Sequence, residues 1–269
     1  MKKLHFFAAI IGIIVMSMAF YSCEKNASGR NTLSLVDDGT VMTMAQEQYT
    51  AFLNENPPVT GTPEADKVAR VSTRVIGGVQ QYLSDIGQSG LVSGYQWEFN
   101  LINNEQANAW CMPGGKIVVY SGILPLTATD DELAVVVGHE IAHAVLKHGN
   151  ERLSQQLLAS YGGAALSTLM SQNPSDAQQL FAAAFGVGST LGTLAFSRKQ
   201  ETESDEAGLY YMAYAKYNPN AAVTFWEKMQ QQSTANPPEI LSTHPSDDTR
   251  IADIKTFLPK AMEYYNKQQ

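Results

Sequence analysis

VVVGHEIAHAVLKHG, residues 135–149, is an apolar segment that carries two histidines, His139 and His143, and a glutamate, Glu140. Polar groups are costly to bury without a partner, so something must pair with each of these three side chains. On a helix, residues four apart lie on one face, so the two imidazole rings can bind one metal ion. Glu140 lies about 100° around the helix from His139, near enough to reach a water on that metal. The spacing therefore predicts a zinc site built on a helix.

A catalytic zinc needs three protein ligands and one open position for water, so a third ligand must come from elsewhere. The segment FSRKQETESDEAG, residues 196–208, carries Glu201 and Asp205 four apart on an expected second helix. One carboxylate can bind zinc while the other accepts a hydrogen bond from a zinc-ligating histidine. Spacing alone does not choose between them. His148 lies half a turn out of phase with His139 and is expected to cap the end of the first helix.

The composition places the chain among ordinary globular proteins. It has 269 residues, enough for one well-packed domain or at most two small ones. With 44% hydrophobic and 16% charged residues, disordered and collagen-like classes are excluded. The net charge of −8 comes without clustered Lys and Arg, so no nucleic-acid partner is expected.

The N-terminus, MKKLHFFAAIIGIIVMSMAFYSC, predicts a signal peptide over residues 1–22, because two lysines precede a short apolar run. Cys23, preceded by Ser22, is similar to the cysteine of a bacterial lipobox. We expect Cys23 to be lipidated and residues 23–38 to tether the domain to a membrane surface. The alternative is a plain secreted protein, although Cys111 is the only other cysteine, which makes a weak disulfide case.

Between the tether and the zinc helix, the pattern changes from helical to extended. Helical spacing predicts helices over residues 41–56 and 65–86, separated by a break rich in proline. Short aromatic and β-branched runs between residues 95 and 120 predict a small antiparallel sheet. Residues 154–196 are rich in small side chains, and we leave open whether they form a lid, a core hairpin or a membrane-contacting segment.

The boundaries of the zinc helix are marked by local signals. Thr129 and Glu132 fit a capping box at its start, and Gly149 is a candidate C-terminal stop. On the second helix, Glu203 and Glu206 are expected to point away from the zinc into solvent.

GHEIAH, followed about sixty residues later by SRKQETESD, resembles the zinc endopeptidase family of the HtpX heat-shock protease, the mitochondrial Oma protease and the CAAX prenyl protease. The small bacterial lipoprotein and periplasmic members (LoiP-like, BepA-like) are the most similar. SGRNTLSLV, NAWCMPGGKIVVYSGIL and STHPSDDTRI also resemble segments of those proteins. The matches extend from about residue 23 to residue 255.

The resemblance implies a mostly helical α+β fold, a gluzincin-type metallopeptidase domain over residues 39–269 with a small antiparallel sheet beside the HExxH helix. It assigns Glu201 as the third zinc ligand and Asp205 as the support of a ligand histidine. Ser204 stands where the family usually has alanine. One Zn²⁺ per chain is implied.

The expected chemistry is hydrolysis of peptide bonds, with Glu140 as general base and acid on a zinc-bound water. His244, the remaining histidine of the mature chain, is expected to reach the open zinc position or the oxyanion. As an inhibitory fourth ligand, it would instead close the site. Asn108 and Arg198 are candidate substrate-binding residues.

The resemblance points to quality control of unfolded or misassembled cell-envelope proteins. The expected location is a bacterial cell envelope, lipid-anchored at the outer membrane and facing the periplasm. The alternatives are a latent or non-catalytic zinc-binding chaperone or scaffold, and an esterase or amidase acting on a small substrate. Sequence leaves the natural substrate, the membrane leaflet and the oligomeric state open.

Overall fold

The computed structural model describes residues 23–162, 166–185, 196–232, 238, 240–244 and 248–268. The expected signal peptide, residues 1–22, lies outside the described residues, as do residues 186–195 of the segment that is rich in small side chains.

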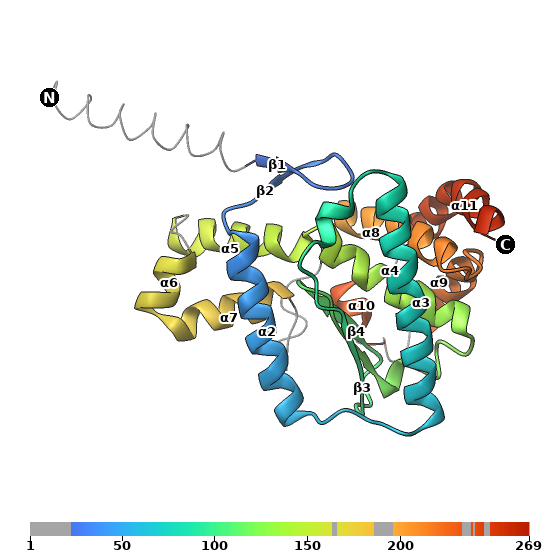
Figure 1. Ribbon diagram of the computed structural model, residues 1–269, viewed down its shortest axis with the longest axis horizontal. Helices are drawn as coiled ribbons and strands as arrows, with labels where there is room; N and C mark the ends of the chain where they lie inside the picture. Colours follow the sequence, from blue (N-terminus) through green and yellow to red (C-terminus); the bar gives the residue numbers. More distant parts are fainter. Residues whose placement is uncertain are drawn as a thin grey trace, which may run out of the picture.

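The centre of the molecule is a pair of helices, α4 (Asp130–Val145) and α8 (Arg198–Tyr214). Helix α4 also packs against α3 (Pro63–Asp85) and α9 (Ala221–Gln232), and α11 (Asp248–Gln268) packs on α8 and α9. In Figure 1, α3, α9 and α11 all lie in the right half of the molecule. The structure is mostly helical, with a three-stranded sheet and a two-stranded one, and it confirms the expected α+β fold class.

Helix α4 begins where the sequence predicts. Thr129 accepts a hydrogen bond from the backbone of Glu132, whose side chain accepts one from the backbone of Thr129. All residues from Glu132 to Val145 are buried, because α3, α8, α9 and the sheet surround the helix. The predicted stop at Gly149 is wrong: α4 ends at Val145, and Lys147 adopts a left-handed φ of 59°.

Gly149 instead lies inside the next helix, α5 (His148–Tyr161). A Cβ on Gly149 would come within 2.0 Å of the Phe185 ring, so the absence of a side chain serves packing and not helix termination.

The small sheet is mixed. Its strands are β3 (Glu98–Ile102), β4 (Ala109–Met112) and β5 (Lys116–Tyr120), in the order β3-β5-β4. Strands β4 and β5 form the expected antiparallel hairpin, but β3 pairs with β5 in parallel. The antiparallel expectation therefore fails for one pair: the loop after β3 carries the chain past the position of β5, which then inserts between β3 and β4.

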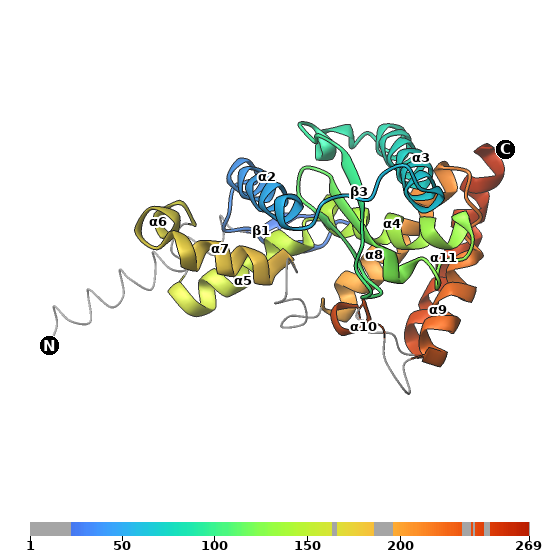
Figure 2. The same cartoon turned by 90° about the horizontal axis from the view of Figure 1, so that it is seen from below.

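The remaining helices form a second layer, seen at the opposite side from α11 in Figure 2. Their apolar side chains make a separate cluster around Tyr49, Trp110, Leu157 and Phe181. They are α2 (Asp38–Glu55), α5, α6 (Leu166–Gln172) and α7 (Pro174–Phe185). Within the described residues, none of the helices is both long and apolar enough to cross a membrane.

The segment after Cys23 is an ordered hairpin and not only a tether. Strands β1 (Cys23–Lys25) and β2 (Asn31–Leu33) pair antiparallel, and β2 contacts α5.

The remaining elements are the short helix α10 (Ile240–Thr243) and two 3-10 turns, η1 (Ser89–Val92) and η2 (Ser121–Ile123). The backbone N–H of Ile240 in α10 donates a hydrogen bond to the Ala107 carbonyl beside the sheet. This contact brings the C-terminal region to the face of α4.

Candidate metal centre

Two glycines let the central helices approach closely. A Cβ on Gly208 of α8 would lie 3.0 Å from the backbone nitrogen of His139, and one on Gly138 of α4 would lie 3.0 Å from the Gly208 carbonyl oxygen. Side chains at either position would push the helices apart. Their absence brings the histidines of α4 within reach of the carboxylates of α8.

Four buried residues converge at this contact: His139, His143, Glu201 and His244. Each offers one ligand atom, and these atoms lie within 4.8 Å of one another. The His143 Nε2 atom lies 3.0 Å from His139 Nε2 and 3.3 Å from Glu201 Oε1. Imidazole nitrogens and a carboxylate are the donors that zinc takes in proteins, so the residues fit a zinc ion.

The two carboxylates that spacing could not separate occupy different places. Glu201 faces the cluster, with Oε1 3.0 Å from His244 Nδ1. Asp205 lies behind His139, its Oδ1 2.9 Å from His139 Nδ1. A proton on Nδ1 then leaves His139 Nε2 free to bind a metal.

Arg250, which our sequence analysis missed, holds these carboxylates in place. It donates from Nε and Nη2 to the two oxygens of Asp205, both at 2.8 Å, and its Nη1 lies 2.9 Å from Glu201 Oε2. The guanidinium also stacks 3.3 Å above the centre of the Trp226 ring. A signal was available, because Arg250 belongs to the STHPSDDTRI segment from which only His244 was selected.

Glu140 lies beside the cluster and does not join it. Its Oε1 atom is 3.5 Å from His244 Nε2 and has no hydrogen-bond partner among the described residues. Burial raises the pKa of Glu140 above its ordinary value. The carboxylate is thus available to a molecule in the neighbouring cavity.

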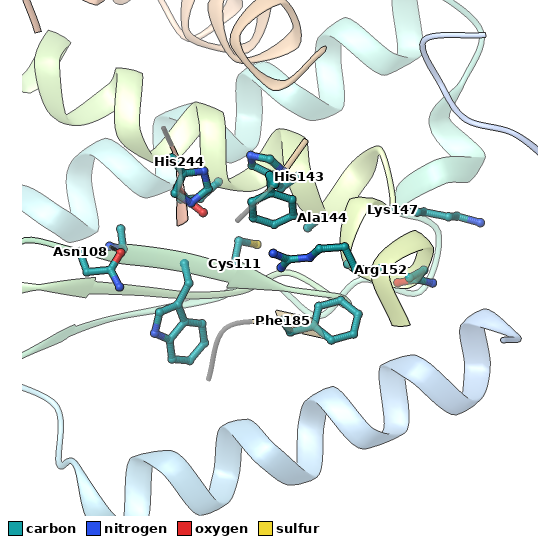
Figure 3. Close-up of a pocket in the computed structure, with 14 residues that line it drawn as sticks. Asn108, Cys111, His143, Ala144, Lys147, Arg152, Phe185 and His244 are labelled. Atoms are coloured by element: carbon teal, nitrogen blue, oxygen red, sulfur yellow. Dashed lines mark hydrogen bonds and ion pairs between the residues drawn. The ribbon is translucent and has the colours of Figure 1, made fainter. Parts of the chain in front are cut away.

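Glu140 lines that cavity. Figure 3 shows His143 and His244 on one side of it and Asn108 and Cys111 on the other. The Asn108 side chain is buried, and its Nδ2 atom has no hydrogen-bond partner within the part of the chain that the structure describes. Its Oδ1 accepts a hydrogen bond from the Ala109 backbone N–H at 2.9 Å, which fixes the orientation of the side-chain amide.

The other candidate substrate residue, Arg198, does not line this cavity. It is exposed at the first position of α8. Arg152 of α5 occupies the cavity wall instead, with its guanidinium carbon 3.5 Å from the centre of the Phe196 ring. Arg152 lies just before the segment rich in small residues, 154–196, and no sequence pattern singled it out.

His148 and Glu203 also differ from expectation. His148 opens α5, so it cannot cap α4; its Nδ1 lies 2.9 Å from His143 Nδ1 and its Nε2 lies 2.9 Å from Glu203 Oε2. Burial lowers the pKa of His148, so the ring is neutral near pH 7. Glu203 is not a solvated acid, because it pairs with His148 and with Arg30 of the N-terminal hairpin.

Peptidase family M48 matches residues 76–258, which include every member of the cluster. The chain belongs to peptidase family M48. The resemblance read from the sequence is confirmed, and so is the enzyme class, a metallopeptidase, at the level of the family.

Relatives of known name align with most of this chain. Mitochondrial metalloendopeptidase OMA1 of Schizosaccharomyces pombe is 35% identical over 81% of the chain and 61% of the relative. Its namesake in Saccharomyces cerevisiae is 31% identical over 76% of the chain and 59% of the relative. The Beta-barrel assembly-enhancing protease of Escherichia coli is 30% identical over 65% of the chain and 38% of the relative. The match thus spans about three fifths or less of these proteins.

The expected location is corrected by these relatives. A lipid-anchored place at the outer membrane of a bacterial envelope was predicted, but OMA1 proteins of two yeasts and of Danio rerio are named as mitochondrial. A signal peptide and a lipobox-like cysteine are short patterns, and they did not determine the compartment.

Proposed function

We propose that this chain is a zinc-dependent endopeptidase that cleaves extended segments of unfolded or misassembled proteins. One observation carries the proposal: the cluster of His139, His143 and Glu201 lies beside Glu140, a buried carboxylate with an unbonded oxygen. A purely structural metal site has no use for such a base.

We assign one zinc per chain to Nε2 of His139, Nε2 of His143 and a carboxylate oxygen of Glu201. Asp205 supports this set, because it fixes the Nδ1 proton of His139. When bound, zinc lowers the pKa of water and polarises a scissile carbonyl.

Glu140 supplies the proton transfers. It takes a proton from the attacking water and passes it to the leaving amine. Burial favours the first of these transfers, because a carboxylate with a raised pKa takes up a proton more readily than a solvated one.

Substrate binding is assigned to the sheet side of the cavity. Strand β4 is an edge strand, and Asn108 immediately precedes it. An extended peptide can add to such an edge, which selects for backbone shape more than for side chains. We assign Asn108 Nδ2, which lacks a hydrogen-bond partner among the described residues, as a donor to a peptide carbonyl. Unfolded segments can present an extended backbone with free N–H and C=O groups to this edge, whereas folded domains cannot.

The bacterial envelope is not proposed as the compartment of these substrates. Lipid attachment at Cys23 stays a prediction, as does the contact with a membrane surface that it would give.

A second function is favoured by His244. Its Nδ1 lies 3.2 Å from His139 Nε2 and 3.0 Å from Glu201 Oε1, so it can be a fourth ligand. Structural zinc sites have four protein ligands and no open position. A latent zinc protein that acts as a chaperone or scaffold is therefore the alternative.

Metal removal tests the proposal. We expect the full chain to cleave thermally unfolded protein but not the same protein folded. Cleavage should stop when a chelator removes the metal and return with Zn²⁺ but not with Mg²⁺. Undiminished cleavage by metal-free protein would contradict it; zinc binding without cleavage, even after His244→Ala, would support the alternative.

A further inference from the structure

Arg30, just before strand β2, ties the N-terminal hairpin to two helices of the metal site. Its Nε lies 2.7 Å from Glu203 Oε1 on α8. Its Nη1 and Nη2 lie 2.8 and 2.7 Å from the two oxygens of Glu151 on α5. Such paired arginine–carboxylate bonds fix orientation as well as distance. Arg30 therefore joins α5 and α8, which enter the site from different parts of the chain.

The hairpin surrounds Glu203 with further donors. Asn26 Nδ2 donates to Oε2 at 3.0 Å, and Ser28 Oγ donates to Oε1 at 2.8 Å. Three residues of the turn between β1 and β2 donate hydrogen bonds to the Glu203 carboxylate. The position of Glu203 therefore depends on the hairpin being docked.

From Glu203 the contacts lead to a proposed metal ligand. His143 Nε2 faces His139 and Glu201, which leaves its Nδ1 to carry the proton. The network then assigns the tautomers: His143 Nδ1–H donates to His148 Nδ1 at 2.9 Å, and His148 Nε2–H donates to Glu203 Oε2 at 2.9 Å. His148 is completely buried, so water cannot replace either contact.

We infer that the β1–β2 hairpin is a positioning element of the metal centre, acting on His143 through Arg30, Glu203 and His148. The inference rests on the proposed function in one respect, that His143 binds the metal. It gives the segment that follows Cys23 a role beyond linking: with the hairpin undocked, Glu203 loses most of its donors and the His143 ring loses its fixed tautomer and orientation.

A matched ion pair elsewhere provides the control. Arg70 of α3 binds both oxygens of Asp130 on α4, at 2.8 and 2.9 Å. This pair holds the first residue of α4, the helix that carries His139 and His143, and makes no contact with a proposed ligand.

The test measures zinc binding by the full chain in competition with a chelator, together with the absorption spectrum of the Co²⁺ form and the steady-state kinetics. We expect Arg30→Met and Glu203→Gln each to weaken zinc binding by about tenfold, as is typical for partners of metal ligands. They should change the Co²⁺ spectrum and lower kcat while KM stays constant. Arg30→Lys, which keeps the charge, should recover part of the affinity, and Arg70→Met should leave zinc binding unchanged.

A double variant tests the path. With His148→Phe in place, Arg30→Met should weaken zinc binding no further, because residues that act through one chain of contacts are not additive. Additive losses would overturn the inference, as would an Arg30→Met variant with a lowered Tm but unchanged zinc binding and Co²⁺ spectrum.

The same experiment separates this inference from the proposed function. If the parent binds zinc but cleaves nothing, the proposed function fails, while the zinc measurements still decide the role of the hairpin. If the parent binds no zinc, both are overturned.

Discussion

The Nε2 atom of His244 lies 3.5 Å from the Oε1 atom of Glu140. The other ring nitrogen of His244 lies 3.0 Å from Glu201. One imidazole thus occupies the space between the proposed base and the proposed ligands, where a water and a substrate carbonyl would have to enter.

We expect His244→Ala to raise kcat/KM on an unfolded substrate, because it opens the position that a catalytic zinc needs. The variant should bind zinc more weakly than the parent, since one donor is lost. Peptide cleavage and zinc content, measured on the same samples, check this. A loss of cleavage with zinc retained would contradict it and would assign His244 to the oxyanion.

Asn108→Ala should reduce kcat/KM by about fivefold to tenfold, mainly through KM, since a lost neutral hydrogen bond is worth about 1 kcal/mol. The reason is that its Nδ2 is buried beside the cavity without a partner. Zinc content should not change.

Asn100→Ala serves as the control for this variant. The Asn100 side chain donates to Tyr49 at 2.7 Å and lies on β3, away from the cavity, so stability should fall while KM stays constant. An effect on KM of the same size in both variants would rule out a specific role for Asn108.

The cluster members on α4 and α8 could be predicted because residues at helical spacing share one face of a helix. Four residues apart on a helix means one face, so His139 with His143, and Glu201 with Asp205, could be paired from the sequence alone. Their separation into ligand and support came only from the family resemblance. Arg250 and His148 were not predicted as partners, because contacts between helices depend on how the chain folds back and not on local spacing.

Gly78→Ala and Gly77→Ala should have opposite effects on the Tm. A Cβ at Gly78 would lie 2.4 Å from the Tyr211 carbonyl oxygen of α8, whereas one at Gly77 would meet nothing within 4 Å. Overpacking costs about 1–3 kcal/mol, and alanine is favoured over glycine in a helix by about 0.5–1 kcal/mol.

Thermal unfolding of the two variants checks this. We expect Gly78→Ala to lower the Tm by roughly 2–10 °C and Gly77→Ala to raise it by roughly 1–4 °C. Equal shifts would mean that α3 and α8 are not in backbone contact at this point.

Glu203 should make stability depend on pH in the acid range. Burial opposes its ionisation, but hydrogen bonds from His148, Arg30 and Ser28 outweigh burial and lower its pKa from 4.5 to about 2. Because the folded-state pKa is below that of the unfolded chain, ionised Glu203 stabilises the fold above about pH 4.5. This contribution is lost as the pH falls through about 2.

Urea unfolding of the parent and of Glu203→Gln checks the sign. The parent should be more stable near neutral pH, and the difference in free energy of unfolding should shrink toward about pH 3. With Arg30→Met in both proteins the difference should be smaller at every pH. A difference that grows in acid would contradict the pairing.

The sheet and the N-terminal segment show where sequence patterns were insufficient. Short aromatic and β-branched runs predicted the strands, but not that β5 would insert between β3 and β4. Polar composition suggested a tether after Cys23, whereas the polar side chains of Asn26, Ser28 and Arg30 all have partners on α8 or α5. A pattern of polar residues does not distinguish solvation from pairing with distant charges.

The most direct test of the central claim compares Glu140→Gln with the parent, each with and without His244→Ala, for zinc content and cleavage of unfolded protein. We predict about one zinc in all four proteins. Cleavage should occur only where Glu140 is intact, and should be fastest with His244 removed. Cleavage that persists in zinc-loaded Glu140→Gln would contradict the account, as would the absence of cleavage in both zinc-loaded proteins that retain Glu140.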